Sequence, residues 1–148
     1  MDEYIITDGG IKHLEELEML EHQCFSMPWT RQQLQSQLPD GQHCFLVAEY
    51  GGKAVGYVGM MYVLDEGYIS NVAVSPEHRR KGIADRLIRE LMTRAGQLEL
   101  AFVTLEVRES NAPAAELYKK HGFVKVGQRK NYYDLPKEDA ILMTKFLK

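Results

Sequence analysis

Long apolar runs are missing from this sequence, and so are two common phosphate-binding motifs. No stretch approaches the roughly 20 apolar residues that a helix needs to cross a bilayer, so we expect no membrane partner. The acidic start, Met1 to Tyr4, precedes no apolar core of the kind a secretory signal carries. Neither G-x-x-x-x-G-K followed by Ser or Thr nor G-x-G-x-x-G occurs. These absences exclude a P-loop NTPase and a dinucleotide-binding Rossmann turn.

Cysteine is scarce as well. The two cysteines, Cys24 and Cys44, cannot build a disulfide framework and lack the spacing of metal ligands, so we expect no metal. Cys44 stands in the apolar run 44–48, which predicts a small core residue. A reducing, cytoplasmic location is the natural interpretation.

A basic excess is also lacking. The net charge of −3 argues against direct nucleic-acid binding, which usually requires a positive surface. Acidic residues gather in 1–27, whereas 75–94 holds six Lys or Arg against three Asp or Glu. This asymmetry would suit an anionic cofactor at one place and a cationic peptide at another, or it reflects ordinary solvated helix faces.

Length and patterning predict one mixed α/β domain over residues 1–148. The chain has 45% apolar and 26% charged residues, typical of a globular protein of this size. Apolar periodicity predicts helices over 11–24, 31–38 (with Thr30 as N-cap and 39–41 as its end), 82–95, and from Asn111 to Gly122. Strands are expected over 5–6, 44–49, 54–64, 66–74, 100–107, 124–133 and 139–146, with a hairpin turn at 50–53.

The most informative segment is the basic loop Arg79-Arg80-Lys81-Gly82-Ile83-Ala84, between an expected strand and an expected helix. The first amides of a helix have no intrahelical partner and lie at the positive end of its dipole. Gly82 would let the backbone approach a ligand closely, and the three basic side chains suit a phosphate. The segment predicts a pyrophosphate-binding turn; the alternative is a solvated, charged loop.

Several motifs together resemble one enzyme family. Arg79, Gly82 and Ala84 form R-x-x-G-x-A after a strand, and LEVRESN (105–111), AELY (115–118) and HGF (121–123) follow downstream. This pattern resembles the GNAT family of acetyl-CoA-dependent N-acetyltransferases. Residues 28–30, 129–133 and 138–143 resemble one branch, the bacterial ribosomal-protein alanine N-acetyltransferases (RimI type).

The resemblance implies a fold and a reaction. The fold would be a mixed, mostly antiparallel sheet of about seven strands with about four helices, splayed between strands four and five. The reaction would be acetyl transfer from acetyl-CoA to the N-terminal alanine of the eighteenth small-subunit ribosomal protein. Alternatives are another amine acceptor (a protein lysine, a polyamine or an aminoglycoside) or a CoA-binding module without turnover.

Two residues are candidates for acid–base chemistry. If Val103, Leu105 and Val107 face the core, strand alternation turns Glu106 to the opposite side, where it matches the family's general base. The alternative is that Glu106 pairs with a basic neighbour. Tyr118 matches the tyrosine that the family places near the thioester sulfur, as general acid; its alternative is a ring buried for packing.

Other positions are expected to bind ligands. The resemblance implies that Asn111, which also suits a helix cap, contacts the cofactor, and that acetyl-CoA lies against Val72, Ala73, Val74, Arg79, Arg80, Lys81, Gly82, Ile83, Ala84 and Tyr118. Trp29, Tyr132 and Tyr133 are candidates for the acceptor groove, with packing as the alternative for Trp29. Strand alternation puts Tyr132 and Tyr133 on opposite faces, so that one at most would touch an acceptor. Neither cysteine matches a reactive position of the family, which favours direct transfer over an acyl-enzyme.

Overall fold

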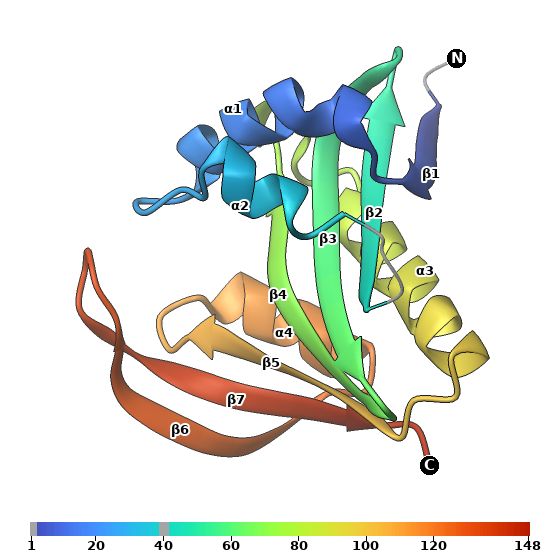
Figure 1. Ribbon diagram of the computed structural model, residues 1–148. Helices are drawn as coiled ribbons and strands as arrows, with labels where there is room; N and C mark the ends of the chain where they lie inside the picture. The colour runs from blue at the N-terminus through green and yellow to red at the C-terminus, as the bar shows by residue number, and fades with distance from the viewer. Residues whose placement is uncertain (1–2, 39–41) are drawn as a thin grey trace.

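The computed structural model describes residues 3–38 and 42–148 (Figure 1). Seven strands form one sheet in the order β1-β2-β3-β4-β5-β7-β6. The strands are β1 (Tyr4–Asp8), β2 (His43–Tyr50), β3 (Lys53–Val63), β4 (Glu66–Val74), β5 (Phe102–Arg108), β6 (Val124–Tyr133) and β7 (Glu138–Phe146). The α-helices are α1 (Leu14–Cys24), α2 (Arg31–Gln35), α3 (Ile83–Gln97) and α4 (Ala112–Lys120), with 3₁₀ turns at Ile11–His13 and Pro76–His78. Within the described ranges, none of the helices combines the length and apolar character that a membrane crossing needs.

The sheet divides between β4 and β5, which form its parallel pair. Pairing there covers only Glu66 to Tyr68 against Phe102 to Thr104. Beyond this point β4 continues to Val74 and β5 to Arg108 without pairing to each other. Figure 1 shows β5, β7 and β6 turning away from the β1–β4 half of the sheet. The predicted splay between strands four and five is confirmed.

Helices cover both faces of the β1–β4 half, α1 and α2 on one side and α3 on the other (Figure 1). A hydrophobic core lies on each face of this half of the sheet, and alternating residues of β2 contribute to the two cores. Phe45 and Val47 pack with α1 in the α1 core, while Leu46 and Ala48 pack with α3 in the other. A strand buried on both faces reads as an unbroken apolar run, which is why β2 has no polar alternation. The Phe45 and Tyr57 rings stack in the α1 core with centroids 5.1 Å apart.

Local chemistry explains most boundaries. The β2–β3 turn uses Gly51 and Gly52 at positive φ (60° and 82°), as the hairpin signal predicts. Thr30 caps α2 by accepting a hydrogen bond from the amide of Gln33 at 3.2 Å. Two boundaries differ from expectation by three residues, and the others by two at most. The first turn of the predicted helix 11–24 is 3₁₀, which leaves Ile11 71% exposed, and α2 ends at Gln35 rather than at residue 38. The predicted stop signal at 39–41 lies outside the described residues.

One carboxylate, that of Glu21, lies inside the α1 core with 1% of the residue exposed. It accepts hydrogen bonds from the Trp29 amide (2.7 Å), the Asn71 Nδ2 (3.2 Å) and the Tyr57 hydroxyl. These bonds connect α1 to β3, β4 and the segment before α2. Burial raises the pKa of Glu21 from 4.5 to about 7, against the lowering effect of the Trp29 and Asn71 hydrogen bonds.

This raised pKa predicts how stability changes with pH. Between 4.5 and about 7 the folded protein holds a proton that the unfolded chain has released, so the free energy of unfolding falls as pH rises. The fall attributable to Glu21 is at most about 3 kcal/mol. Glu21→Gln keeps an oxygen for the Trp29 amide and removes the titration. In urea unfolding from about pH 5 to about pH 8, the variant should gain stability relative to the wild type as pH rises. A constant difference across that range would show that Glu21 does not titrate there.

Candidate functional site

A cleft of about 1430 Å³ opens where β4 and β5 separate. Its walls come from the α1–α2 connection, β4, the 79–84 loop, β5, α4 and the β6–β7 connection. Every candidate site residue except Lys81 lines it: Trp29, Val72, Ala73, Val74, Arg79, Arg80, Gly82, Ile83, Ala84, Glu106, Asn111, Tyr118, Tyr132 and Tyr133. Six segments that are separate in the sequence thus meet in one cleft.

The 79–84 loop forms a backbone cradle at the start of α3. Arg80 and Gly82 both adopt left-handed conformations (φ 64° and 77°), which turn successive amides toward one side. The first intrahelical bond runs from the Arg86 amide to the Gly82 carbonyl at 3.0 Å. Over the described part of the chain, the amides of Ile83, Ala84 and Asp85 have no backbone or side-chain acceptor. Such amides at a helix N-terminus are suited to an anion.

An acidic residue, Asp85, lies beside this cradle, and neighbouring cations compensate its charge. Its carboxylate lies 3.1 Å from Lys120 Nζ and 2.9 Å from His121 Nε2, and it also pairs with Arg89 at 2.7 Å. The hydrogen bond from Lys120 is the main cause that lowers the pKa of Asp85. The carboxylate therefore remains ionised and paired, which reduces its repulsion of an anion in the cradle.

The side chain of Arg79 is fixed within the protein. Its Nε donates to the carbonyl of Val74 at 3.1 Å, and its Nη2 lies 3.5 Å from the Cys24 sulfur. Arg79 thereby joins the end of β4 to the end of α1. Because β5 has already diverged, the β4 edge from Val72 to Val74 has no partner strand on the cleft side in the described structure. An extended ligand could pair with this edge.

Glu106 faces the cleft from β5. Val103, Leu105 and Val107 are buried, which confirms the predicted alternation. The Tyr68 hydroxyl donates to Oε1 of Glu106 at 2.6 Å. Burial and this hydrogen bond raise the pKa of Tyr68, so its hydroxyl remains a donor at neutral pH. Tyr68 was not predicted, because its contact depends on the parallel Tyr68–Thr104 register of β4 and β5.

Tyr118 approaches the cleft from α4. Its ring packs on Phe123 at 5.8 Å between centroids, and 7% of the residue is exposed. Burial raises the pKa of Tyr118, which keeps the phenol protonated. Asn111 caps α4, since its Oδ1 accepts from the Ala114 amide at 3.2 Å. This confirms the predicted cap; a contact of Asn111 with the cofactor stays a prediction.

Tyr132 and Tyr133 line the same cleft, so the prediction of opposite faces is wrong. Their rings meet edge to face, with centroids 5.0 Å apart. The cause is an irregularity in β6 between Arg129 and Tyr133, where Asn131 adopts a left-handed φ of 53°. A bulge of this kind breaks the alternation of side chains along a strand.

Trp29 has the packing role considered for it, and its contact with an acceptor stays a prediction. It packs against the α1 core and also lines the cleft. Its amide is held by Glu21, which fixes the position of the α1–α2 connection. The α1–α2 connection and the β6–β7 connection thus both contribute to the lining of the cleft.

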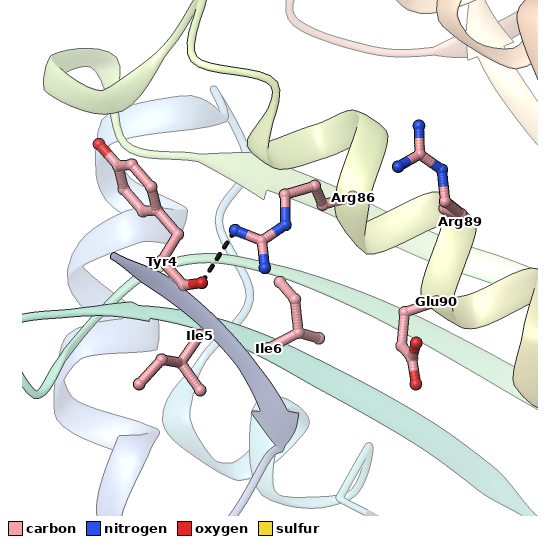
Figure 2. Close-up of a pocket in the computed structure, with 6 residues that line it drawn as sticks. All are labelled: Tyr4, Ile5, Ile6, Arg86, Arg89 and Glu90. Carbon is pink, nitrogen blue, oxygen red and sulfur yellow. Dashed lines mark hydrogen bonds between the residues drawn. The ribbon is translucent and has the colours of Figure 1, made fainter. Parts of the chain in front are cut away.

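A smaller hollow of about 410 Å³ lies between β1 and α3, away from the candidate residues (Figure 2). There the Arg86 guanidinium donates to the carbonyl of Tyr4 at 2.8 Å. Arg86 therefore stabilises the outer edge of β1.

The comparisons with known proteins agree with this geometry. The sequence profile of the Acetyltransferase (GNAT) family matches residues 14–123. The [Ribosomal protein bS18]-alanine N-acetyltransferase of Escherichia coli K12 is 32% identical over 126 residues, covering 84% of each chain. The enzyme of that name from Haemophilus influenzae is 32% identical over 146 residues, 97% of this chain and 99% of the relative.

A solved structure shows the same fold. The crystal structure of the ribosomal-protein-S18-alanine N-acetyltransferase from Escherichia coli superposes with a TM-score of 0.92 at 28% identity, covering 99% of this chain and 95% of that one. Together with the family match over most of the chain, this similarity establishes that the protein belongs to the GNAT family and is an acetyl-CoA-dependent N-acetyltransferase.

Proposed function

We propose that this enzyme acetylates the N-terminal alanine amine of ribosomal protein bS18, with Glu106 as general base and Tyr118 as general acid. The acceptor follows from the relatives, which carry that activity in their names. The observation that carries the proposal is the placement of Glu106. Its carboxylate faces the cleft at the point where the sheet divides, with Tyr68 holding one oxygen.

Acetyl-CoA would lie along the separated edge of β4. The pyrophosphate fits the free amides of residues 83–85, and the pantetheine arm fits the β4 edge from Val72 to Val74, which has no partner strand on the cleft side. Arg80 and Lys81 add positive charge to this end of the cleft. Asn111 and Tyr118 line the cleft from the α4 side, where the thioester would lie.

The transfer is a direct displacement. The alanine nitrogen attacks the thioester carbonyl carbon, a C–N bond forms, and the C–S bond breaks. Glu106 accepts a proton from the amine, directly or through one water, and still has oxygen lone pairs free beside the Tyr68 bond. Tyr118 acts as the general acid by donating a hydrogen bond to the departing thiolate, whether or not the proton is fully transferred, and its raised pKa keeps the phenol protonated as a donor.

Mass spectrometry of a set of acceptors tests the proposed substrate. The set contains a peptide with the mature bS18 N-terminus, the same peptide with a blocked N-terminus and an added lysine, and a polyamine. We expect one acetyl group on the free alanine terminus only. Modification of the lysine or the polyamine would retain the enzyme class and reject bS18 as the acceptor.

Glu106→Gln should reduce kcat by about 100-fold or more while the affinity for acetyl-CoA stays within about twofold, because a positioned base contributes to the transition state only. Initial rates and calorimetric titration with acetyl-CoA measure the two effects. Glu109→Gln, an exposed position one residue beyond β5, is the matched control and should behave as wild type. Loss of acetyl-CoA binding in Glu106→Gln would instead assign Glu106 a structural role.

Gly82→Glu should abolish acetyl-CoA binding, because a carboxylate at the cradle would crowd and repel the pyrophosphate. The matched control is Gly52→Glu. Gly52 has a similar φ (82° against 77°) and equally open surroundings, but it lies in the β2–β3 turn. Both variants place a side chain at a similar positive φ, so their comparison in a binding titration isolates the effect on the ligand. Unchanged affinity in Gly82→Glu would show that the pyrophosphate binds elsewhere.

A further inference from the structure

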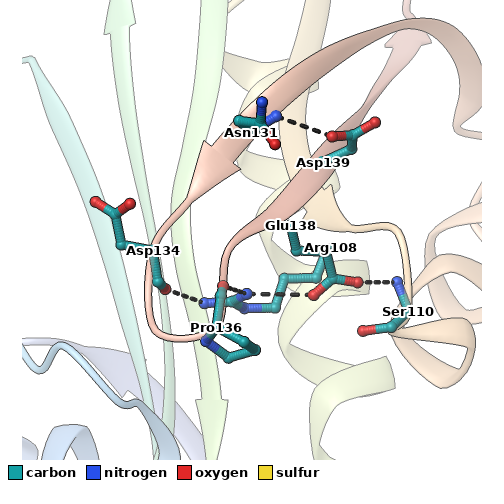
Figure 3. A network of polar contacts seen from close by, with 7 residues as sticks. All are labelled: Arg108, Ser110, Asn131, Asp134, Pro136, Glu138 and Asp139. Atoms are coloured by element: carbon teal, nitrogen blue, oxygen red, sulfur yellow. Dashed lines mark hydrogen bonds and ion pairs between the residues drawn. The ribbon is translucent and has the colours of Figure 1, made fainter.

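The guanidinium of Arg108 connects the end of β5 to the β6–β7 connection (Figure 3). Its Nη2 donates to the carbonyl of Asp134 at 3.0 Å, and its Nη1 donates to the carbonyl of Pro136 at 2.9 Å. These two carbonyls flank Leu135, which adopts a left-handed φ of 47°. One side chain therefore fixes both sides of the turn.

Glu138 extends this contact to the start of α4. Its Oε1 lies 3.2 Å from Arg108 Nη1, and its Oε2 accepts a hydrogen bond from the Ser110 amide at 2.5 Å. The hydrogen bonding with Ser110, followed by that from Arg108, lowers the pKa of Glu138. Glu138 therefore remains charged at neutral pH and links the turn to the residue before the α4 cap, Asn111.

The turn held in this way forms part of the cleft wall. Tyr133, Asp134, Leu135 and Pro136 all line the cleft. The Arg108 guanidinium also lies over the Tyr133 ring, 4.3 Å from its centroid, which adds a cation–π contact. Figure 3 shows the Asp134 carboxylate directed away from this network, while the backbone carbonyl of Asp134 faces Arg108.

We propose that Arg108 is a positioning residue for the acceptor: it holds the turn 133–136 in the conformation that completes the acceptor side of the cleft. This inference rests on the proposed function, since it takes the acceptor to be a peptide that contacts this turn. Hydrogen bonds to a charged group are stronger than neutral ones, and four contacts converge on this guanidinium.

The main contacts that hold Glu106 and the amide cradle do not involve the Arg108 guanidinium. Glu106 is held by Tyr68, and the amide cradle is built by the 79–84 loop at the start of α3. Loss of the Arg108 guanidinium should therefore weaken acceptor binding, while acetyl-CoA binding and the chemical step change little. A general packing defect would instead weaken the binding of both the acceptor and acetyl-CoA.

Steady-state kinetics of Arg108→Met with the bS18 peptide at saturating acetyl-CoA test the proposal. We expect KM for the peptide to rise roughly tenfold to 100-fold, with kcat and the Kd for acetyl-CoA within about threefold of wild type. Arg108→Lys retains the charge but cannot hold two carbonyls in the same geometry. Its KM for the peptide should therefore lie between those of the wild type and Arg108→Met. Glu138→Gln, a milder change, should raise the peptide KM by about threefold.

Lys137→Met is the matched control. It removes one positive charge from the same connection, and Lys137 makes no hydrogen bond or ion pair with any residue that the structure describes. A peptide KM for Arg108→Met no higher than that of Lys137→Met would overturn the proposal. A parallel loss of acetyl-CoA affinity would overturn it too, because the role would then be structural.

Hydrogen exchange of the amides in 131–137 separates this inference from the proposed acceptor. If the wild type leaves the bS18 peptide unmodified, the acceptor is wrong, and exchange alone decides the role of Arg108. Faster exchange in Arg108→Met than in Lys137→Met, with 79–84 unchanged, supports the positioning role. Equal exchange in the two variants refutes it.

Discussion

The separation of β4 from β5 after three paired residues is the constraint on which the rest of the molecule depends. Full pairing would satisfy the β4 edge and bring Glu106 against its neighbour strand. Because pairing stops at Tyr68, the backbone from Val72 to Val74 stays open, and Glu106 faces a cleft. The last parallel pair also places Tyr68 within hydrogen-bond distance of Glu106. The same break in the sheet thus provides both a binding edge and a positioned carboxylate.

The cleft is completed by two irregular segments, each anchored by an ionisable side chain. Buried Glu21 holds the Trp29 amide on one side, and Arg108 holds the carbonyls of Asp134 and Pro136 on the other. Irregular backbone at a binding site needs such partners, because it lacks the hydrogen bonds of a sheet. Rigid anchoring also reduces the entropy cost of binding a peptide.

Much of this arrangement follows from local sequence. The apolar runs, the Gly51-Gly52 turn and the Thr30 and Asn111 caps predict the elements, because each rests on neighbouring residues. Contacts between residues far apart in the sequence cannot be predicted from local sequence in this way. Tyr68 reaches Glu106 through a register between strands, and Glu21 resembles the other glutamates of α1 in sequence although it alone among them is buried. Tyr132 and Tyr133 share a face because of a bulge at Asn131, and a single asparagine within a strand pattern does not by itself predict a bulge.

A crystal structure with CoA and the bS18 N-terminal peptide bound together tests the central claim most directly. The account predicts the pantetheine arm against the β4 edge, the pyrophosphate on the amides of 83–85, and the alanine nitrogen within about 3.5 Å of Glu106 or one water away. A peptide terminus bound away from Glu106, or a cofactor outside the gap between β4 and β5, would contradict it.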